Sequence, residues 1–202
     1  MGQARCAVAC TCLAVTASLL GGTAAADRPS QASPAPPGEW VRSVCGTLAS
    51  WRGDVEHAAT DATNAAQKAR KLSDSAQVKQ AKQALVTFLG AAIDATTAAE
   101  TNLRAVGEPS AANSAGVEDA LIASFDELVS FYESSRARTQ AVSAKNADRA
   151  HTKLSSIAKA VTSQSDEVES LMNRAITMDA SGELSGAVAA EPGCADVLGG
   201  EA

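Results

Sequence analysis

The chain has 202 residues, of which 46% are hydrophobic and only 3% aromatic, and its net charge at neutral pH is −6. This length allows one well-buried domain and leaves little material for a second. The acidic balance argues against general binding of nucleic acid, so any contact with a polyanion must be local.

Residues 1–26 have the pattern of a secretory signal peptide. Arg5 precedes an apolar run from Cys6 to Leu20, and small residues follow up to Ala26. The run is shorter than the roughly 20 apolar residues that span a bilayer, and no later segment reaches that length. We therefore expect cleavage near residue 26, a secreted or cell-wall-associated protein, and no transmembrane segment.

The next segment, 27–38, is rich in Pro, Ala and Ser, which predicts a disordered spacer. Cleavage would leave two cysteines, Cys45 and Cys194, in a chain bound for an oxidising compartment. An even pair of cysteines there is most simply a disulfide, because the close-spaced Cys and His ligands of a zinc site are missing.

Residues 39–180 show the periodicity of long amphipathic helices. In two segments the apolar side chains keep a strict heptad spacing, and in two further segments they keep it less strictly. Such a pattern predicts helices with one buried face each. In chain order the four segments are 39–76, 78–106, 114–144 and 147–178.

Three breaks separate these segments. The turn signals at 73–75 and 107–110 are clear, whereas the break near Asn146 lacks glycine and proline and would also fit a continuous helix. With all three breaks, the sequence predicts an all-α, up-down-up-down four-helix bundle of long antiparallel helices closed by the disulfide. A Gly-rich C-terminal tail, 181–202, would carry Cys194 back to the first helix.

The two ends of such a bundle would differ in packing. Burial of a large apolar side chain contributes about 1.5–3 kcal/mol and burial of an alanine far less. The end away from the disulfide offers mainly alanines from the first two helices, so it must pack by close helix approach or remain labile. The large residues expected at the disulfide end are Trp40, Val41, Leu48, Trp51, Leu103, Val106, Val117, Leu121, Phe125, Val168, Leu171, Met172 and Ile176.

Lysines and arginines gather in two windows, 66–84 and 136–160, where only Asp74 and Asp148 oppose them. Helical parity brings both windows to the pole away from the disulfide. Cations near helix C-termini complement the helix dipole, but those near first turns do not. We interpret the windows as a candidate contact surface for an anionic envelope polymer or another protein, with an ordinary solvated surface as the alternative. The residues are Lys68, Arg70, Lys71, Lys79, Lys82, Arg136, Arg138, Lys145, Arg149, Lys153 and Lys159.

No arrangement of residues points to catalysis. The serines stand outside Gly-x-Ser-x-Gly and Ser-x-x-Lys motifs, and the Glu-x-x-His motif of di-iron bundles is missing. His57 and His151 would lie roughly 16 Å apart along antiparallel first and fourth helices, which is too far to share a metal ion. We expect no enzymatic activity, no cofactor and no metal.

A small ligand held between helices, as in a sensor-like bundle, is the alternative function. Small side chains at mid-bundle would leave a cavity there if the helices stay apart, or would bring the helices together. The residues that would line the cavity are Ala58, Ala62, Thr96, Thr97 and Ala99.

The first helix opens with Trp40-Val41-x-x-Val44-Cys45-x-x-Leu48-x-x-Trp51, after a cleavable signal and a Pro/Ala/Ser spacer. This layout resembles that of uncharacterised secreted all-helical proteins of high-GC Gram-positive bacteria. The resemblance implies a compartment and a helical fold, and no activity. We therefore expect a secreted, non-enzymatic bundle that serves as a binding or spacer module at the cell envelope.

Overall fold

A computed structural model describes residues 34–70, 73–179 and 181–198 of the chain. The described chain is all-helical and joined by the Cys45–Cys194 disulfide, as the sequence predicts. It has six helices instead of the four predicted, because the C-terminal tail is also helical. The helices are α1 (Pro37–Ala69), α2 (Asp74–Val106), α3 (Val117–Gln140), α4 (Ala147–Thr177), α5 (Glu183–Ala190) and α6 (Pro192–Leu198).

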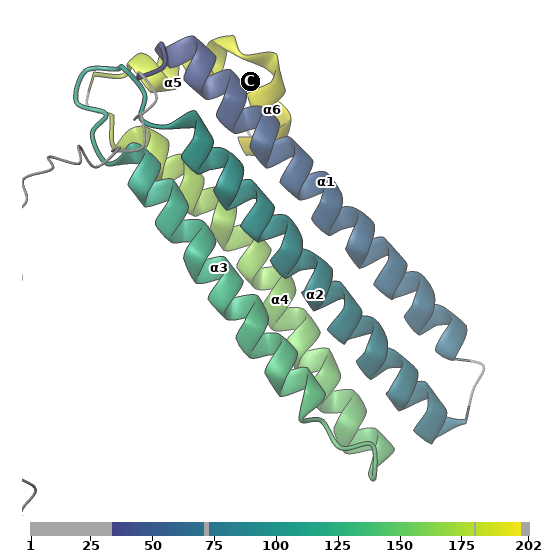
Figure 1. The fold of residues 1–202 in the computed structure, drawn as a ribbon. Helices are drawn as coiled ribbons and strands as arrows, with labels where there is room; N and C mark the ends of the chain where they lie inside the picture. The colour runs from purple at the N-terminus through teal and green to yellow at the C-terminus, as the bar shows by residue number, and fades with distance from the viewer. Residues whose placement is uncertain (1–33, 71–72, 180, 199–202) are drawn as a thin grey trace, which may run out of the picture. The chain divides into compact units, whose positions relative to one another are not determined.

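The four long helices run alternately from one pole of the molecule to the other (Figure 1). The break near Asn146 exists, since α3 ends at Gln140 and α4 begins at Ala147. Asn146 is the N-cap of α4: its Oδ1 accepts a hydrogen bond of 2.9 Å from the backbone N–H of Arg149, which satisfies one of the free donors at the helix start. The α1–α2 and α3–α4 connections therefore lie at the same pole.

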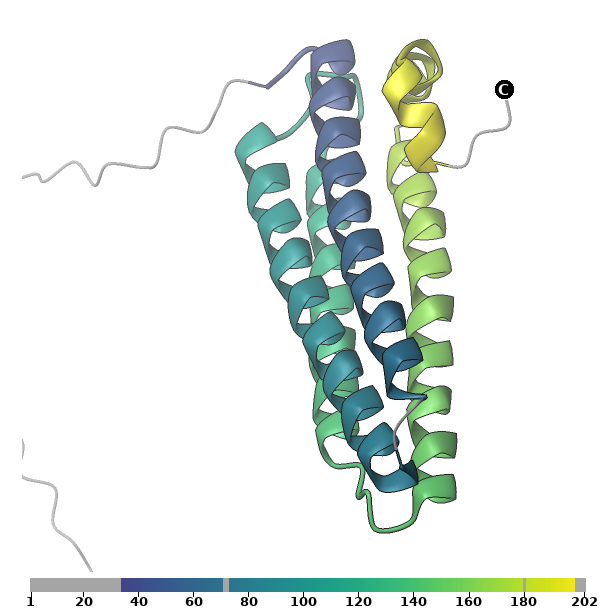
Figure 2. The same ribbon diagram turned by 90° about the vertical axis from the view of Figure 1, so that its right-hand side faces the viewer.

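The ring of long helices stays open between α1 and α4. Helix α1 packs along α2, α2 along α3, and α3 along α4, but in the described chain no Cα atoms of α1 and α4 come within 8 Å of each other. Near the disulfide, α5 and α6 contact both of these helices (Figure 2). Toward the other pole, nothing in the described chain takes the place between them.

The pole that holds Cys45 and Cys194, here called the disulfide pole, contains the large apolar side chains, as predicted. The indole N–H of Trp40 donates to the carbonyl oxygen of Gly107 at 2.7 Å, which ties the start of α1 to the end of α2. Of the predicted residues, Trp40, Val41, Leu48, Trp51, Leu103, Val117, Leu121 and Phe125 are buried and Val106 is half-buried. The side chains of Val168, Leu171, Met172 and Ile176 lie outside the described part of the structure.

Burial along the predicted seam of α1 is high at both ends of the helix and lower in its middle, since Ala69 near its end is 1% exposed. Val41, Val44 and Leu48 are almost fully buried, whereas the seam positions from Val55 to Ala65 are half-buried. Of these half-buried positions, Val55 and Ala62 line the open side between α1 and α4. The middle of α1 thus contacts α2 and remains open toward α4.

The last residues before α1 pair with the α2–α3 connection. The backbone N–H of Ala35 donates to the carbonyl of Glu108 at 3.3 Å, and the carbonyl of Ala35 accepts from Ser110 at 2.8 Å. The prediction of a disordered spacer over 27–38 is therefore wrong at its end, because Ala35 is paired and α1 begins at Pro37. The signal peptide predicted over 1–26 lies outside the described residues.

The prediction that the helical domain ends at residue 180 is also wrong, because α5 and α6 extend it to Leu198. Gly182 has a φ of 76°, a left-handed conformation that suits glycine, and it turns the chain from α4 into α5. Leu184 and Val197 are buried against the core, which explains why this part of the chain is ordered.

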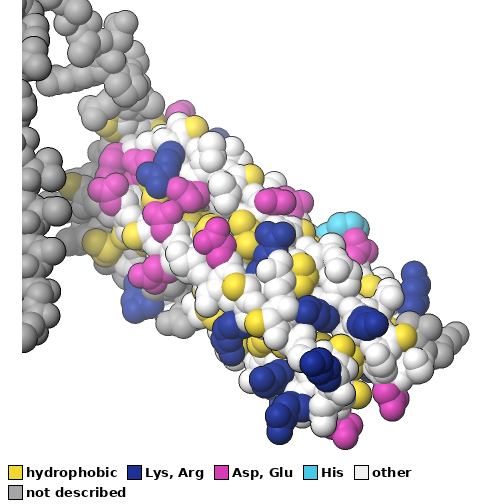
Figure 3. Space-filling view, turned by 60° about the horizontal axis from the view of Figure 1, so that its bottom comes forward, with side chains coloured by type: hydrophobic (Ala, Val, Ile, Leu, Met, Phe, Trp, Pro, Cys, Tyr) yellow, Lys and Arg dark blue, Asp and Glu magenta, His cyan; other side chains and the backbone are white. Residues whose placement is uncertain are grey.

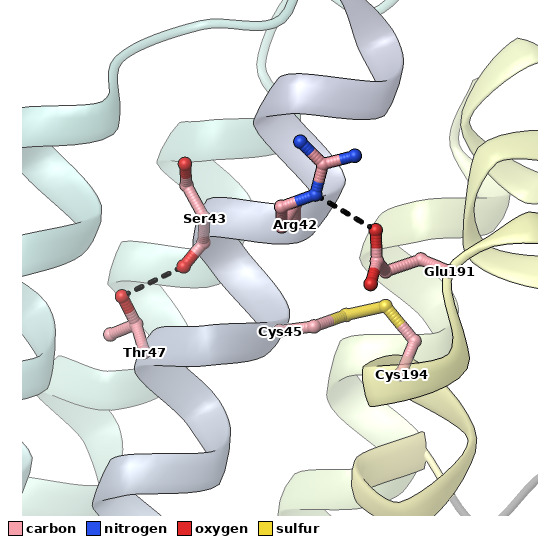
Figure 4. Close-up of a disulfide and its surroundings, with 6 residues drawn as sticks. All are labelled: Arg42, Ser43, Cys45, Thr47, Glu191 and Cys194. Carbon is pink, nitrogen blue, oxygen red and sulfur yellow. Dashed lines mark hydrogen bonds and ion pairs between the residues drawn. A yellow bond between two sulfur atoms is a disulfide. The ribbon is translucent and has the colours of Figure 1, made fainter.

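The disulfide joins α6 to the third turn of α1 (Figure 4). The Cα atoms of Cys45 and Cys194 are 5.2 Å apart, and both cysteines are buried. Beside them, Arg42 forms an exposed ion pair of 3.1 Å with Glu191, the residue that precedes α6. The tail therefore returns to α1 as the antiparallel order of the helices requires.

None of the helices in the described part of the chain has a stretch that is both long and apolar enough to cross a membrane.

Candidate functional site

Both windows of basic residues come together at the pole formed by the α1–α2 and α3–α4 connections. Figure 3 shows lysine and arginine side chains gathered over this half of the molecule and mostly carboxylates over the other. We define the basic pole as the described members of the set: Lys68, Arg70, Lys79, Lys82, Arg136, Arg138, Lys145, Arg149, Lys153 and Lys159. Lys71, the remaining predicted member, lies outside the described residues.

Lys82 has a structural partner at this pole. Its Nζ donates to the carbonyl oxygens of Gln140 at 2.5 Å and Val142 at 3.0 Å, at the end of α3. The last carbonyls of a helix have no intrahelical donor, and a cation there also complements the helix dipole. A lysine near the start of α2 thus serves as the cap of α3, which accounts for its position without any external ligand.

Arg136 lies across the α2–α3 contact. A Cβ atom placed on Gly90 of α2 would be 3.9 Å from Cζ of Arg136, an ordinary van der Waals contact, so the guanidinium lies beside α2 at Gly90. Arg136 remains exposed.

The other members of the basic pole are exposed, and within the described chain none of them has a carboxylate within 4.0 Å. The carboxylates of the two windows, Asp74 and Asp148, stand at the starts of α2 and α4, where negative charge complements the helix dipole. The pole therefore presents an excess of unneutralised cations to solvent. These cations are Lys68, Arg70, Lys79, Arg138, Lys145, Arg149, Lys153 and Lys159.

An apolar groove opens where α1 and α4 part. It has a volume of ≈ 610 Å³ and is lined by residues 51–66 of α1, 81–88 of α2 and 151–162 of α4, with Val197 of α6 at one end. Phe88 and Leu154 are buried in its floor, and Thr63 stands at its rim. A cleft of this size falls within the range of small-molecule sites.

At the mid-bundle position where the sequence left open a cavity or a close approach of helices, the groove is not found. Thr96 is fully buried and its Oγ1 accepts a hydrogen bond of 3.1 Å from the Trp51 indole, so packed side chains fill that position. Thr97 is exposed. Of the five residues expected to line the cavity, Ala62 alone belongs to the lining of the groove.

Sequence reasoning missed most of the groove residues because they flank the heptad seam instead of lying on it. Ala59 and Ala66 on α1, and Ser155 and Ala158 on α4, are small residues adjacent to the seam over the same height of the molecule. That coincidence of small residues on two neighbouring antiparallel helices is the signal that would have indicated a gap.

The histidines do not form a metal site. His57 is 81% exposed and lies 3.6 Å from Asp61 one turn later on α1. His151 is exposed at the rim of the groove near the start of α4. Among the described residues, no group of three or more His, Cys, Asp and Glu side chains is placed to hold a metal ion.

Carboxylates concentrate near the ends of α2 and α3 that meet at the disulfide pole. Arg104 forms an ion pair of 2.6 Å with Glu100, and this hydrogen bond raises the pKa of the guanidinium. Partial burial, and then the proximity of Glu108 and Asp119, raises the pKa of Glu118. Acidic residues therefore concentrate at the disulfide pole, whereas lysines and arginines concentrate at the basic pole.

Comparison of the chain with protein-family models, with curated proteins and with solved structures finds no match.

Proposed function

We propose that this protein is a secreted, non-enzymatic binding module that contacts an anionic polymer of the cell envelope through its basic pole. The observation that supports this proposal is the set of exposed cations without carboxylate partners in the described chain, gathered from the four long helices and two connections. An up-down-up-down bundle would be the scaffold that carries these cations at a distance from the disulfide pole.

Secretion is supported by the disulfide, since such bonds persist mainly in oxidising compartments. The apolar run from Cys6 to Leu20 and the Pro/Ala/Ser-rich segment after it agree with export. The resemblance to secreted helical proteins of high-GC Gram-positive bacteria places the envelope of such a cell among the expected surroundings.

The position of the cations explains why a localised contact is expected despite a net charge of −6. Surface charges act over about one Debye length, roughly 8–10 Å at physiological salt. A polymer at the basic pole would therefore experience the nearby cations and little of the acidic disulfide pole. Binding of this kind releases counterions and weakens steeply as salt rises.

The test compares the retention of two charge-matched triple variants on immobilised polyphosphate at low salt. The pole variant carries Arg70→Gln, Arg149→Gln and Lys153→Gln, and it should elute at lower salt than the wild type. The control variant removes three exposed arginines nearer the disulfide pole and should elute later than the pole variant: Arg42→Gln, Arg104→Gln and Arg174→Gln. Identical elution of the two variants would show that net charge, and not the pole, governs retention.

A second candidate function, the binding of a small ligand between helices, is favoured by the groove between α1 and α4. The two functions are compatible, because the groove ends close to the basic pole but none of its lining residues belongs to that pole.

A further inference from the structure

The groove is elongated and its walls are low. Its lining spans residues 51–66 of α1, which is roughly 22 Å at 1.5 Å per residue. The walls carry small side chains, with Ala59, Ala62 and Ala66 on α1 and Ala158 on α4. These small side chains leave the space between the two helices open to a narrow molecule.

The floor of the groove is apolar and already shielded. Ala84 and Phe88 of α2, together with Leu154 and Val161 of α4, are buried beneath it. Two hydroxyls of the lining, those of Thr63 and Thr162, donate to carbonyls of their own helices and so are engaged already. A hydrocarbon chain would remove from water the apolar surface that the walls still expose.

The two ends of the groove have different chemistry. At the end toward the disulfide pole, Trp51 and Val197 close it with apolar surface. At the other end, His151 lies on the rim, and Arg70 follows Ala66 by four residues, which places it on the same face of α1. The Arg52 and Glu56 pair on the rim neutralises itself at 2.9 Å. The groove therefore runs from an apolar end to a cationic one.

We propose that the groove binds an anionic amphiphile with one hydrocarbon chain and a carboxylate or phosphate head. The chain lies between α1 and α4 above Phe88, and the head lies at Arg70 and His151. This inference rests on the proposed function only for the cationic character of the head-group end. The pole keeps an excess of positive charge because only two carboxylates oppose the cations of the basic windows. These are Asp74 and Asp148, at the starts of α2 and α4.

The probes are dodecanoate, dodecyl phosphate and the uncharged dodecyl maltoside, each titrated calorimetrically into the disulfide-intact protein below its micelle concentration. The expected result is one site per chain that prefers the two anionic probes. Comparison of dodecanoate with dodecyl phosphate shows which head the site accepts. Binding of many molecules per chain, or equal binding of all three probes, would overturn the proposal.

Two pairs of variants locate the site. Ala62→Phe with Ala158→Phe fills the groove and should weaken binding at least tenfold, whereas Ala123→Phe with Ala137→Phe adds the same bulk to the exposed face of α3 and should not. Arg70→Gln with His151→Gln should weaken binding of the anionic probes alone. Its control, Arg104→Gln with His57→Gln, changes the same residue types outside the basic pole and outside the groove lining, and it should leave binding unchanged. The charge variants add no bulk, so they test the site even if the variant with Ala62→Phe and Ala158→Phe does not fold.

Two other outcomes are distinguishable. The wild type could prove to be a dimer that the groove-filled variant converts to a monomer, with amphiphile binding unchanged. In that case a second copy of the chain occupies the groove and the proposal is wrong. Retention of the groove-filled variant on polyphosphate should equal that of the wild type. Loss of amphiphile binding with intact retention in the groove-filled variant therefore separates the two sites. Failure of the pole variant to elute earlier than its control would contradict the proposed function alone, because it leaves the amphiphile result of the groove-filled variant untouched.

Discussion

Trp51 donates its indole N–H to Oγ1 of Thr96, 3.1 Å away, at the level where the buried core meets the groove. The Thr96 hydroxyl in turn donates to the carbonyl of Ala92 at 2.6 Å. The Trp51 ring also packs edge-on against Phe125, with ring centroids 5.4 Å apart. One side chain thus joins α1 to both α2 and α3 and forms the apolar end of the groove.

Replacement of Thr96 by valine keeps the shape of the side chain and removes the acceptor. Because the indole N–H would lose its protein partner in a buried position, we expect the free energy of unfolding to fall by about 1–3 kcal/mol. Thr101→Val is the matched control, since the exposed Thr101 makes the same kind of bond to Thr97 and should change stability by less than about 0.5 kcal/mol. Equal effects of the two changes in urea denaturation would mean that the bond from Trp51 contributes nothing.

The disulfide should be the largest single contribution to the stability of the disulfide pole. Its cysteines are 149 positions apart in the sequence, for which the chain-entropy model gives an upper value of about 5 kcal/mol. Cys45→Ala with Cys194→Ala should lower the free energy of unfolding by several kcal/mol, and the amides of α5 and α6 should exchange with solvent first. Unchanged exchange in these two helices would show that the burial of Leu184 and Val197 holds them without the bond.

Lys82 should matter for stability and Lys79 should not. Lys82→Met removes two hydrogen bonds from a charged donor to the end of α3, so we expect a loss of about 1.5–3 kcal/mol. Lys79→Met removes the same charge from an exposed position on the same helix and should cost less than about 0.5 kcal/mol. Thermal unfolding of the two variants gives the comparison. A similar small loss in both would mean that water caps α3 equally well.

Local periodicity explains why the helices and the disulfide were predictable. The heptad spacing around Val41 and Leu48 depends only on which face of a helix is buried, and the pairing of Cys45 with Cys194 follows from the number of reversals between them. Asn146 precedes a helical pattern and is a preferred N-cap residue, so even the weakest break had a local cause.

The groove and the caps depend on distances between helices, which periodicity does not encode. Ala62 is compatible with a close approach of α4 and with a gap, so the sequence around it does not decide which occurs. The bond from Lys82 to Gln140 joins residues 58 positions apart and has no signature in the sequence near either of them. The helices α5 and α6 in the predicted Gly-rich tail were missed for a different reason, because the carboxylate of Asp179 bonds to the backbone of α5 from four residues before its start.

Asp179 holds the junction between α4 and α5. Its carboxylate accepts hydrogen bonds from the Ser181 hydroxyl and backbone N–H, at 2.5 and 2.9 Å, and from the Leu184 N–H at 2.8 Å. The bond from the Ser181 hydroxyl and then that from the Leu184 N–H lower the pKa of this carboxyl. The ionised form therefore fits the folded protein better than the protonated form does.

The pH dependence follows from that direction. An aspartate whose pKa is lower in the folded than in the unfolded state stabilises the fold fully above its unfolded pKa of about 4, and this contribution is lost as pH falls through the folded pKa. Asp179→Asn should therefore be less stable than the wild type at pH 7, and the difference should shrink between about pH 5 and the acid limit of folding. Urea denaturation followed by tryptophan fluorescence across this range measures it. Asp54→Asn, an exposed change on α1, should leave the docking of α5 intact. A difference between wild type and Asp179→Asn that stays constant with pH would mean that the hydrogen bonds, and not the charge, hold α5.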